Sequence, residues 1–290
     1  MKAIKNLIIS LVVIVAILGV AIIGGYIYVR TTYGIDLFRT AGQLKTLTQA
    51  VDETALCPNA YGEEDFAAMK TELNKKFDGF IFYEEGKGYN GYSVDFGSLA
   101  GKSLSGKISL TEKQVGAITQ TVFYEQTGGK IKIAEKEVSV SVVQVDFSQI
   151  AENGSADFNV VAKLDLTPLK SNMNDFPYKY FKKYIPDSFY VSSTVRVDKT
   201  EANGFDYTIV HKSLTLNNLS ADDTADLFDT LNAVLKIGTA ESLNTQIGYM
   251  AVNALIGTKD NPGFAYSMKV AGATTFNFVT ASPADCFIVN

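Results

Sequence analysis

The strongest constraint on the fold is an alternation of apolar and polar residues in the middle of the chain. Apolar side chains occupy every second position from Val138 to Val142, and again from Phe158 to Leu166. A period of two places successive side chains on opposite faces of a β-strand, so each segment predicts a strand with one buried face. After Val142 the apolar set moves by one position to Val143, which predicts a β-bulge or bend in the first strand.

Further strands and turns follow from the same pattern. Alternating apolar residues span Phe189 to Val197, Phe264 to Val270 and, more briefly, Tyr92 to Phe96. The Asn-Gly pairs at 153–154 and 203–204 lie between strand-like segments and are typical of tight hairpin turns. The strands are therefore expected to pair as antiparallel neighbours.

Helices are predicted to interrupt the strands at three places. Thr111 and Gln114 form a capping-box pair ahead of an apolar stripe, and Ser220 and Asp223 form another. A third helix is predicted over residues 240–256, where apolar residues recur at helical spacing.

The N-terminal region contains an apolar segment of another kind. The 23 residues from Leu7 to Val29 carry no charge, enough for a helix to cross the roughly 30 Å hydrocarbon core of a bilayer. Lys2 and Lys5 precede the segment and only Arg30 follows closely, so the positive-inside rule predicts a cytoplasmic N-terminus. A cleaved signal peptide is the alternative, but its apolar core is shorter. The sequence thus predicts a single-pass cell-membrane protein with an extracytoplasmic C-terminal domain.

These patterns divide the chain into three parts. Residues 1–30 are predicted to be a cytoplasmic stub and a transmembrane anchor, residues 31–78 a helical stalk, and residues 79–290 an extracytoplasmic domain. The expected fold class is α+β: the anchor is followed by a strongly curved antiparallel β-sheet wrapped on long amphipathic helices.

The composition excludes several functional classes. Asp+Glu 31 exceed Lys+Arg 26, so nucleic acid is not an expected partner. With one His and two Cys in the chain, no metal site and no cofactor are predicted. In an oxidising compartment Cys57 and Cys286 are predicted to form a disulfide, with two unpaired thiols as the alternative.

Three features that suggest chemistry have simpler interpretations. Residues 86–91 match G-x-G-x-x-G, but strand-like alternation follows instead of a helix, so they predict a Gly-rich hairpin. His211 lies in a strand-like segment, and no G-x-S-x-G nucleophile motif accompanies it in the sequence, so we interpret it as a half-buried strand residue. Asp222, Asp223 and Asp226 fall in the first turns of a predicted helix, where the helix dipole favours acids.

One segment, Phe176 to Tyr190, combines aromatic rings with lysines. Such a cluster suits a lipid headgroup interface or another anionic partner. The alternative is a helix that packs its rings on the sheet and leaves its lysines in solvent. The residues predicted for headgroup or partner contact are Lys179, Tyr180, Lys182, Lys183 and Tyr184.

The order of the elements carries a resemblance. Residues 108–115 read as a strand followed by a threonine-capped helix, and the segments 185–189 and 214–217 frame a later hairpin. This order resembles the YpmS-like anchored extracytoplasmic proteins, and it is similar to the tubular lipid-binding (TULIP-like) and AsmA-like architecture over about residues 105–235. The resemblance implies a curved sheet that wraps a long helix around an apolar groove. Gly116 departs from it, because an asparagine is common at that helix position.

Two classes of function compete. The first is a membrane-tethered, non-catalytic protein that binds or carries a lipid or isoprenoid-type apolar ligand. The second is a cell-envelope interaction or scaffold protein that docks a protein or a wall glycan. An enzyme is a third hypothesis and would need a carboxylate pair such as Asp146 with Asp165, which no motif supports. The residues predicted to line an apolar ligand groove are Phe228, Leu231, Leu235, Ile247, Met250 and Leu255.

Overall fold

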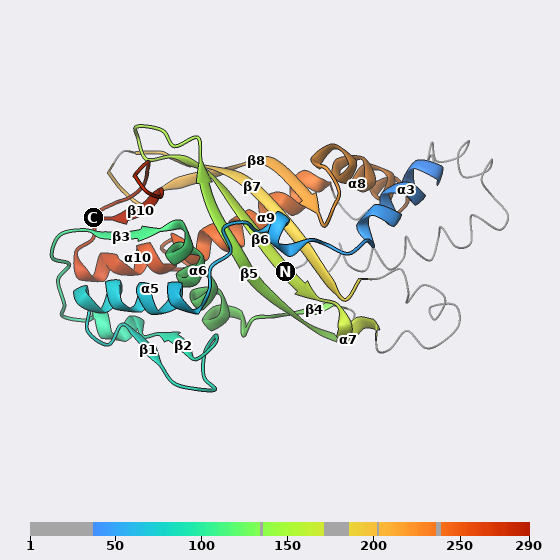
Figure 1. Ribbon diagram of the computed structural model, residues 1–290. Helices are drawn as coiled ribbons and strands as arrows, with labels where there is room; N and C mark the ends of the chain where they lie inside the picture. The colour runs from blue at the N-terminus through green and yellow to red at the C-terminus, as the bar shows by residue number, and fades with distance from the viewer. Residues whose placement is uncertain (1–36, 134–135, 171–185, 202, 236–238) are drawn as a thin grey trace.

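The computed structural model describes residues 37–133, 136–170, 186–201, 203–235 and 239–290, which form an α+β fold (Figure 1). The main sheet consists of β4 (Lys130–Ile133), β5 (Lys136–Ser148), β6 (Ala156–Asp165), β7 (Ser188–Lys199) and β8 (Tyr207–Leu216). These strands lie in the order β4-β5-β6-β7-β8, and each neighbouring pair is antiparallel. The antiparallel pairing expected from the alternation and the Asn-Gly turns is therefore confirmed.

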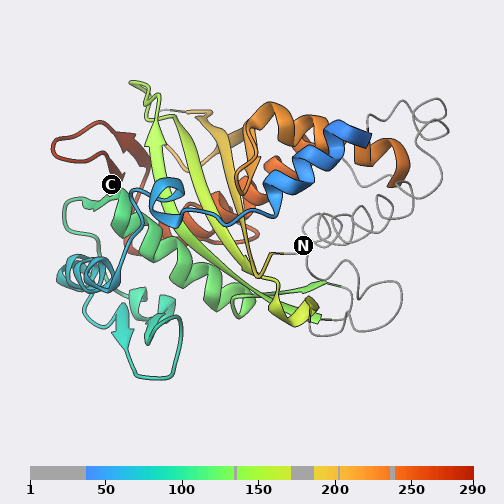
Figure 2. The same ribbon diagram turned by 45° about the vertical axis from the view of Figure 1, so that its right-hand side comes forward.

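Two helices cover one face of this sheet, which we call the inner face (Figure 2). Helix α6 (Glu112–Thr127) packs on β5, helix α9 (Ala240–Leu255) packs on β7 and β8, and the two helices also contact each other. The capping box of Thr111 and Gln114 begins α6, as the sequence predicts. Between the helices and the sheet lies the apolar core, which includes the fully buried Phe158, Phe189 and Val195.

A second sheet closes one end of the core. It contains β3 (Ile108–Thr111), β10 (Cys286–Val289) and β9 (Phe276–Val279) in that order. The ring centroids of Phe147 on β5 and Phe278 on β9 are 4.8 Å apart, so aromatic packing joins the two sheets. Lys199 joins them as well, since its Nζ donates to the carbonyl of Phe276 at 2.6 Å.

The remaining elements surround these layers. They are α3 (Leu37–Leu47), α4 (Glu53–Leu56), α5 (Glu63–Lys76), β1 (Ile81–Tyr83), β2 (Tyr92–Val94), η1 (Phe96–Leu99), α7 (Thr167–Lys170), α8 (Ala221–Leu235), α10 (Phe264–Ser267) and η4 (Met268–Ala271). Helix α5 packs on α6 and buries Phe66, Met69 and Leu73 in the main core. The segment between α3 and α5 crosses the opposite, outer face of the main sheet (Figures 1 and 2).

Strand β5 contains a β-bulge at the position predicted from the sequence. Val142 pairs with Ala162, whereas Gln144 pairs with Val161, so Val143 is an extra residue in β5. Without it, Gln144 would have the same parity as Val142 and would face the inner core. The bulge therefore turns Gln144 to the outer face.

A second bulge lies between β7 and β8. Thr194 pairs with Ser213 and Val195 pairs with His211, so Lys212 is the extra residue in β8. The shift explains why His211 and Leu214, which are an odd number of positions apart, both lie on the inner face.

Each bulge is held by an amide side chain from an inner-face helix. Gln120 on α6 accepts a hydrogen bond from the backbone N–H of Val142 at 2.6 Å. Asn244 on α9 donates to the backbone carbonyl of Thr194 at 2.8 Å. Both amide side chains are completely buried. The N–H of Val142 faces the edge of β5 that β4 leaves uncovered, since the N–H of Val140 bonds Gly129 on the same side. The helices that pack beside the two bulges thus satisfy buried backbone groups there.

Beyond β4, none of the described strands pairs with this edge of β5, because β4 pairs only with residues 136–139. Side chains cover this edge. Glu112 accepts a hydrogen bond from the N–H of Phe147 at 2.6 Å, and the hydroxyl of Tyr61 donates to the carbonyl of Val142. Edges that are covered in this way are less able to pair with another chain.

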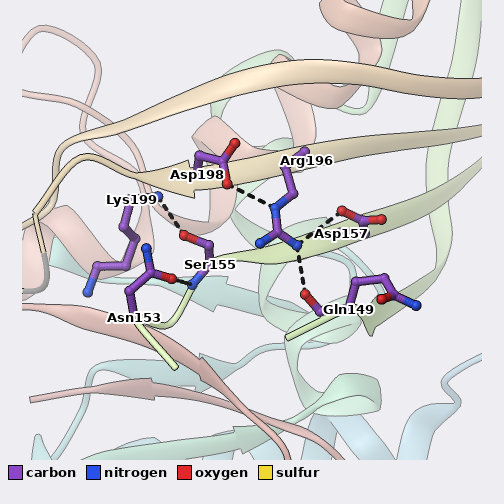
Figure 3. Close-up of polar contacts among 7 residues, drawn as sticks. All are labelled: Gln149, Asn153, Ser155, Asp157, Arg196, Asp198 and Lys199. Atoms are coloured by element: carbon purple, nitrogen blue, oxygen red, sulfur yellow. Dashed lines mark hydrogen bonds and ion pairs between the residues drawn. The ribbon is translucent and has the colours of Figure 1, made fainter. Parts of the chain in front are cut away.

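On the outer face, Arg196 links two strands and a turn (Figure 3). Its guanidinium donates to Asp198 at 2.9 Å, to Asp157 at 3.2 Å and to the carbonyl of Gln149 at 2.7 Å. These bonds fix the turn between β5 and β6 to β7.

Two features of the predicted fold are wrong. The main sheet is open and twisted, and it does not curl strongly around a helix (Figures 1 and 2). Because α6 and α9 lie side by side, the sheet spreads over both helices instead of wrapping one. The predicted strand from Phe264 to Val270 is instead α10 followed by η4; Phe264, Met268 and Ala271 are buried at helical spacing.

The predicted membrane anchor and the single-pass location that depends on it are also corrected. Within the described ranges, no helix has both the length and the apolar character needed to cross a membrane. The helices α6 and α9 have 16 residues each, below the roughly 20 that a spanning helix needs. The anchor predicted over residues 7–29 lies outside the described residues.

The predicted disulfide is wrong, because Cys57 and Cys286 are free thiols. Cys57 follows α4 on the outer face and packs against Val161 and Tyr190. Cys286 begins β10 in the second sheet, where it pairs in register with Thr111. The two cysteines therefore belong to different layers of the fold.

The buried amide of Gln120 supplies a test of the β5 bulge. Replacing Gln120 with Ala leaves the buried N–H of Val142 without its acceptor, so the free energy of unfolding is expected to fall by about 1–3 kcal/mol in urea denaturation. Gln126→Ala, which changes an exposed glutamine of the same helix, is the control and should cost much less. Equal losses in the two variants would contradict the role given to Gln120.

Candidate functional site

A pocket of about 460 Å³ lies on the outer face, beside the β5 bulge. Its volume falls within the roughly 300–1,000 Å³ of typical small-molecule sites. The walls come from distant parts of the chain: α4 and the loop after it, the start of α5, the β1–β2 loop, and strands β5 to β7. Aromatic and charged side chains dominate its described lining; they are Tyr61, Phe66, Tyr89, Tyr190, Glu53, Glu63 and Lys163.

The bulge fixes the loop that forms one wall. Because Gln144 faces outward, its side-chain oxygen Oε1 accepts a hydrogen bond from the backbone N–H of Asn59 at 3.0 Å. The side chain of Asn59 donates to Asp146 at 3.0 Å, and Gln144 also donates to that carboxylate. Three polar side chains thus hold the loop between α4 and α5 against β5.

Tyr61 ties the same loop to α6. Its hydroxyl donates to the carbonyl of Val142, and its ring lies against Gly116. A Cβ atom at position 116 would come within 2.3 Å of the Tyr61 ring. The glycine that departs from the resembled families therefore makes room for an aromatic wall of the pocket.

The Gly-rich segment at residues 86–91 is the β1–β2 hairpin loop, as the sequence predicts, and it forms another wall. Gly88 and Gly91 have positive φ angles of 57° and 89°. A Cβ at Gly88 would come within 2.0 Å of the carbonyl oxygen of Tyr92, so a side chain does not fit there. The glycines let the loop turn tightly and place Tyr89 and Asn90 at the pocket.

A polar cluster occupies the other side of the pocket. Lys163 on β6 and Tyr190 on β7 are cross-strand partners, and both point to the outer face. Glu53 of α4 accepts from Lys163 Nζ at 2.9 Å and from the hydroxyl of Tyr190. Lys163 Nζ also lies 5.3 Å from the centroid of the Tyr190 ring. The carboxylate of Glu53 thereby binds both the ammonium of Lys163 and the phenol of Tyr190.

These contacts move the pKa values of the cluster away from neutrality. Hydrogen bonds from Tyr190 and Lys163 lower the pKa of Glu53. Hydrogen bonds with Tyr190 and Glu53 raise the pKa of Lys163. Burial, together with the hydrogen bond to Glu53, raises the pKa of Tyr190. At neutral pH the cluster therefore holds a carboxylate, an ammonium and a neutral phenol.

Cys57 lines the pocket as a protonated thiol. Burial raises its pKa to about 11, and the neighbouring carboxylates of Glu53 and Asp146 add to the shift. A thiol needs a lowered pKa to act as a nucleophile at neutral pH, so Cys57 is unsuited to that role.

The residues predicted to line an apolar groove lie elsewhere. Phe228, Ile247 and Leu255 are buried in the main core, and Met250 packs against it. The pocket lining includes none of these four residues. Leu231 and Leu235 lie on α8, and their side chains are outside the described part of the structure.

The predicted headgroup or partner residues, Lys179, Tyr180, Lys182, Lys183 and Tyr184, lie outside the described residues. Within the same predicted aromatic segment, Tyr190 is described, and it lines the pocket.

The other sequence features receive structural explanations. His211 is a half-buried strand residue, as predicted, and its Nδ1 lies 2.7 Å from Nδ2 of Asn244. Asp226 of α8 pairs with Arg39 at 2.6 Å. Among the described residues, no group of three or more His, Cys, Asp or Glu side chains could hold a metal ion.

Most of the site is not predictable from local sequence patterns. Glu53, Tyr61, Tyr89 and Lys163 were not predicted, because they meet only after strands and loops far apart in the chain are brought together. Two signals pointed toward them. The parity shift at Val143 marks the bulge beside the pocket, and the Gly-rich hairpin marks the wall that carries Tyr89.

No protein-family model, no curated protein and no solved structure matches this chain.

Because Gly116 contacts the Tyr61 ring, replacing it with alanine should change stability in the direction opposite to that expected from helix propensity. Alanine is favoured over glycine in a helix by about 1 kcal/mol, so Gly42→Ala on α3, where a Cβ meets nothing, should stabilise the protein. Gly116→Ala should destabilise it, because the new Cβ displaces the Tyr61 ring. Thermal unfolding of the two variants checks this, and stabilisation by Gly116→Ala would contradict the packing described.

The raised pKa of Cys57 makes a second prediction. When the native full chain is treated with iodoacetamide at neutral pH, Cys286 should be alkylated while Cys57 stays unmodified, because Cys57 is buried and protonated. In denaturant both should react. Peptide mass spectrometry reads the two sites separately; faster labelling of Cys57, or a disulfide-linked peptide, would show that the thiol chemistry is wrong.

Proposed function

We propose that this chain is a non-catalytic binding protein whose pocket beside the β5 bulge takes a small organic ligand. The observation that carries the proposal is a pocket of about 460 Å³ whose walls are held in place by hydrogen bonds, and the protonation of its side chains supports it. General acids, general bases and nucleophiles need pKa values close to the working pH, and enzymes tune them in that direction. Here the pKa values of Glu53, Lys163, Tyr190 and Cys57 all move away from neutrality. Such groups bind and orient a ligand better than they transfer its protons.

The construction of the walls supports binding. Tyr61 is tied to β5, Asn59 is held by two side chains of β5, and the polar cluster links α4 to β6 and β7. A pocket whose walls are already fixed loses little conformational entropy when a ligand enters.

The carboxylate pair considered for an enzyme does not favour catalysis. Asp146 accepts hydrogen bonds from Asn59 and Gln144, and Asp165 accepts from the N–H of Thr167 at 2.9 Å. Both carboxylates serve the local fold. A lipid or isoprenoid ligand stays a prediction from the sequence, and the charged cluster in this pocket does not suit an alkyl chain.

A matched pair of variants tests the proposal without knowledge of the ligand. A fragment library is screened against the full chain by saturation-transfer NMR. Ala60→Trp places a large side chain at an exposed lining position, whereas Ala55→Trp places it on an exposed position of α4 outside the lining. We expect a set of fragments that bind the wild type and Ala55→Trp but not Ala60→Trp, and that are recovered unchanged.

The proposal fails if no fragment bound by the wild type is sensitive to Ala60→Trp. Chemical turnover of a bound fragment that stops in Ala60→Trp would contradict the non-catalytic part of the proposal.

A further inference from the structure

We infer that the ligand of this pocket is an uncharged saccharide of one or two sugar rings. The inference rests on the proposed binding function and specifies its ligand class. It follows from three properties of the lining: Glu53 and Lys163 are paired, the polar groups include both donors and acceptors, and aromatic rings share the pocket with this polar cluster.

The pairing of Glu53 with Lys163 disfavours an ionic ligand at the polar cluster. Glu53 and Lys163 already form an ion pair at 2.9 Å, and Lys163 also faces the Tyr190 ring. An anionic ligand that approaches Lys163 meets the carboxylates of Glu53 and Glu63 in the same lining. A cationic ligand that approaches Glu53 meets the ammonium of Lys163. An uncharged ligand leaves the pair intact, so it avoids both repulsions.

The same cluster favours a ligand with several hydroxyl groups. Carboxylate oxygens only accept hydrogen bonds, an ammonium only donates, and a phenol does both. A hydroxyl group can both donate and accept, so adjacent hydroxyls can bond Glu53 and Lys163 at once. Thr54 and Asn90 extend the set of polar partners along the pocket. An alkyl ligand would cover these groups without replacing their bonds to water.

The aromatic lining requires that the ligand also has an apolar face. Tyr61, Phe66 and Tyr89 come from the loop before α5, from α5 and from the β1–β2 loop, on the side away from β7. A sugar ring presents C–H groups on one face and hydroxyls at its rim, so it can cover an aromatic ring while its rim reaches the polar cluster. The volume of about 460 Å³ suits one or two such rings.

Sugars that share one ring and differ only in charge test this inference. The probes are glucose, galactose and mannose, the uronic acid of each, and the protonated 2-amino sugar of each, together with cellobiose and cyclohexanol. Binding to the full chain is measured by saturation-transfer NMR. We expect a neutral sugar to bind most tightly in at least one configuration, and we expect Ala60→Trp to abolish its signal.

Charge variants sharpen the test. Glu53→Gln leaves Lys163 without its carboxylate, so the uronic acid should gain affinity relative to the neutral sugar. Lys163→Met frees Glu53, so the amino sugar should gain. Tyr190→Phe removes one hydroxyl and should weaken the neutral sugar by about tenfold. The matched controls Glu64→Gln, Lys113→Met and Tyr249→Phe change exposed residues outside the lining and should leave the preferences as in the wild type.

The outcomes separate this inference from the proposed function. If a charged sugar or cyclohexanol binds most tightly and is displaced by Ala60→Trp, the pocket binds ligands but the saccharide assignment is wrong. If no sugar binds in a way sensitive to Ala60→Trp while library fragments do, the saccharide assignment is also wrong and the binding function stands. If neither sugars nor fragments show that sensitivity, both are wrong.

Discussion

The hydrogen bond between the Gln120 amide and the backbone of Val142 is the interaction on which the outer-face pocket depends. Val142 directly precedes the extra residue Val143, and its N–H faces the edge of β5 that β4 leaves uncovered, where an unpaired buried group is costly. Gln120 satisfies that N–H from α6 and so holds β5 beside the bulge. The outward turn of Gln144 follows, and with it the anchoring of the loop through Asn59.

The second bulge uses the same device. Asn244 of α9 reaches the carbonyl of Thr194, just as Gln120 of α6 reaches the N–H of Val142. Among the described residues, one atom of each buried amide has no hydrogen-bond partner, namely Nε2 of Gln120 and Oδ1 of Asn244. Both helices are thereby fixed in register against the sheet, because a shift along either axis would leave further polar groups unsatisfied.

Local patterns in the sequence predict much of this fold. The parity shift at Val143 gives the β5 bulge, the box formed by Thr111 and Gln114 gives the start of α6, and the glycines of residues 86–91 give a hairpin. The short alternation at Phe264 misled the prediction, because four residues fit a strand and a helical turn equally well.

The pocket could not be predicted in the same way. Glu53 and Tyr190 are 137 positions apart, and only the packing of α4 on the outer face brings them together. The helix faces that carry Phe228 and Ile247 were predicted to line a groove, but they are buried in the main core. Helical periodicity predicts that a face is covered, but it does not distinguish a closed core from a ligand cavity.

The dependence of the pocket on the Gln120 contact is tested most directly by a map of ligand-induced amide shifts in a two-dimensional ¹H–¹⁵N NMR spectrum of the full chain. A neutral saccharide that binds is titrated into the wild type and into Gln120→Ala. We expect the largest shifts on Val142, Val143 and Tyr89, and we expect them to weaken when Gln120 no longer holds β5 beside the bulge. Shifts centred on the apolar faces of α8 and α9, or shifts unchanged in Gln120→Ala, would contradict this expectation.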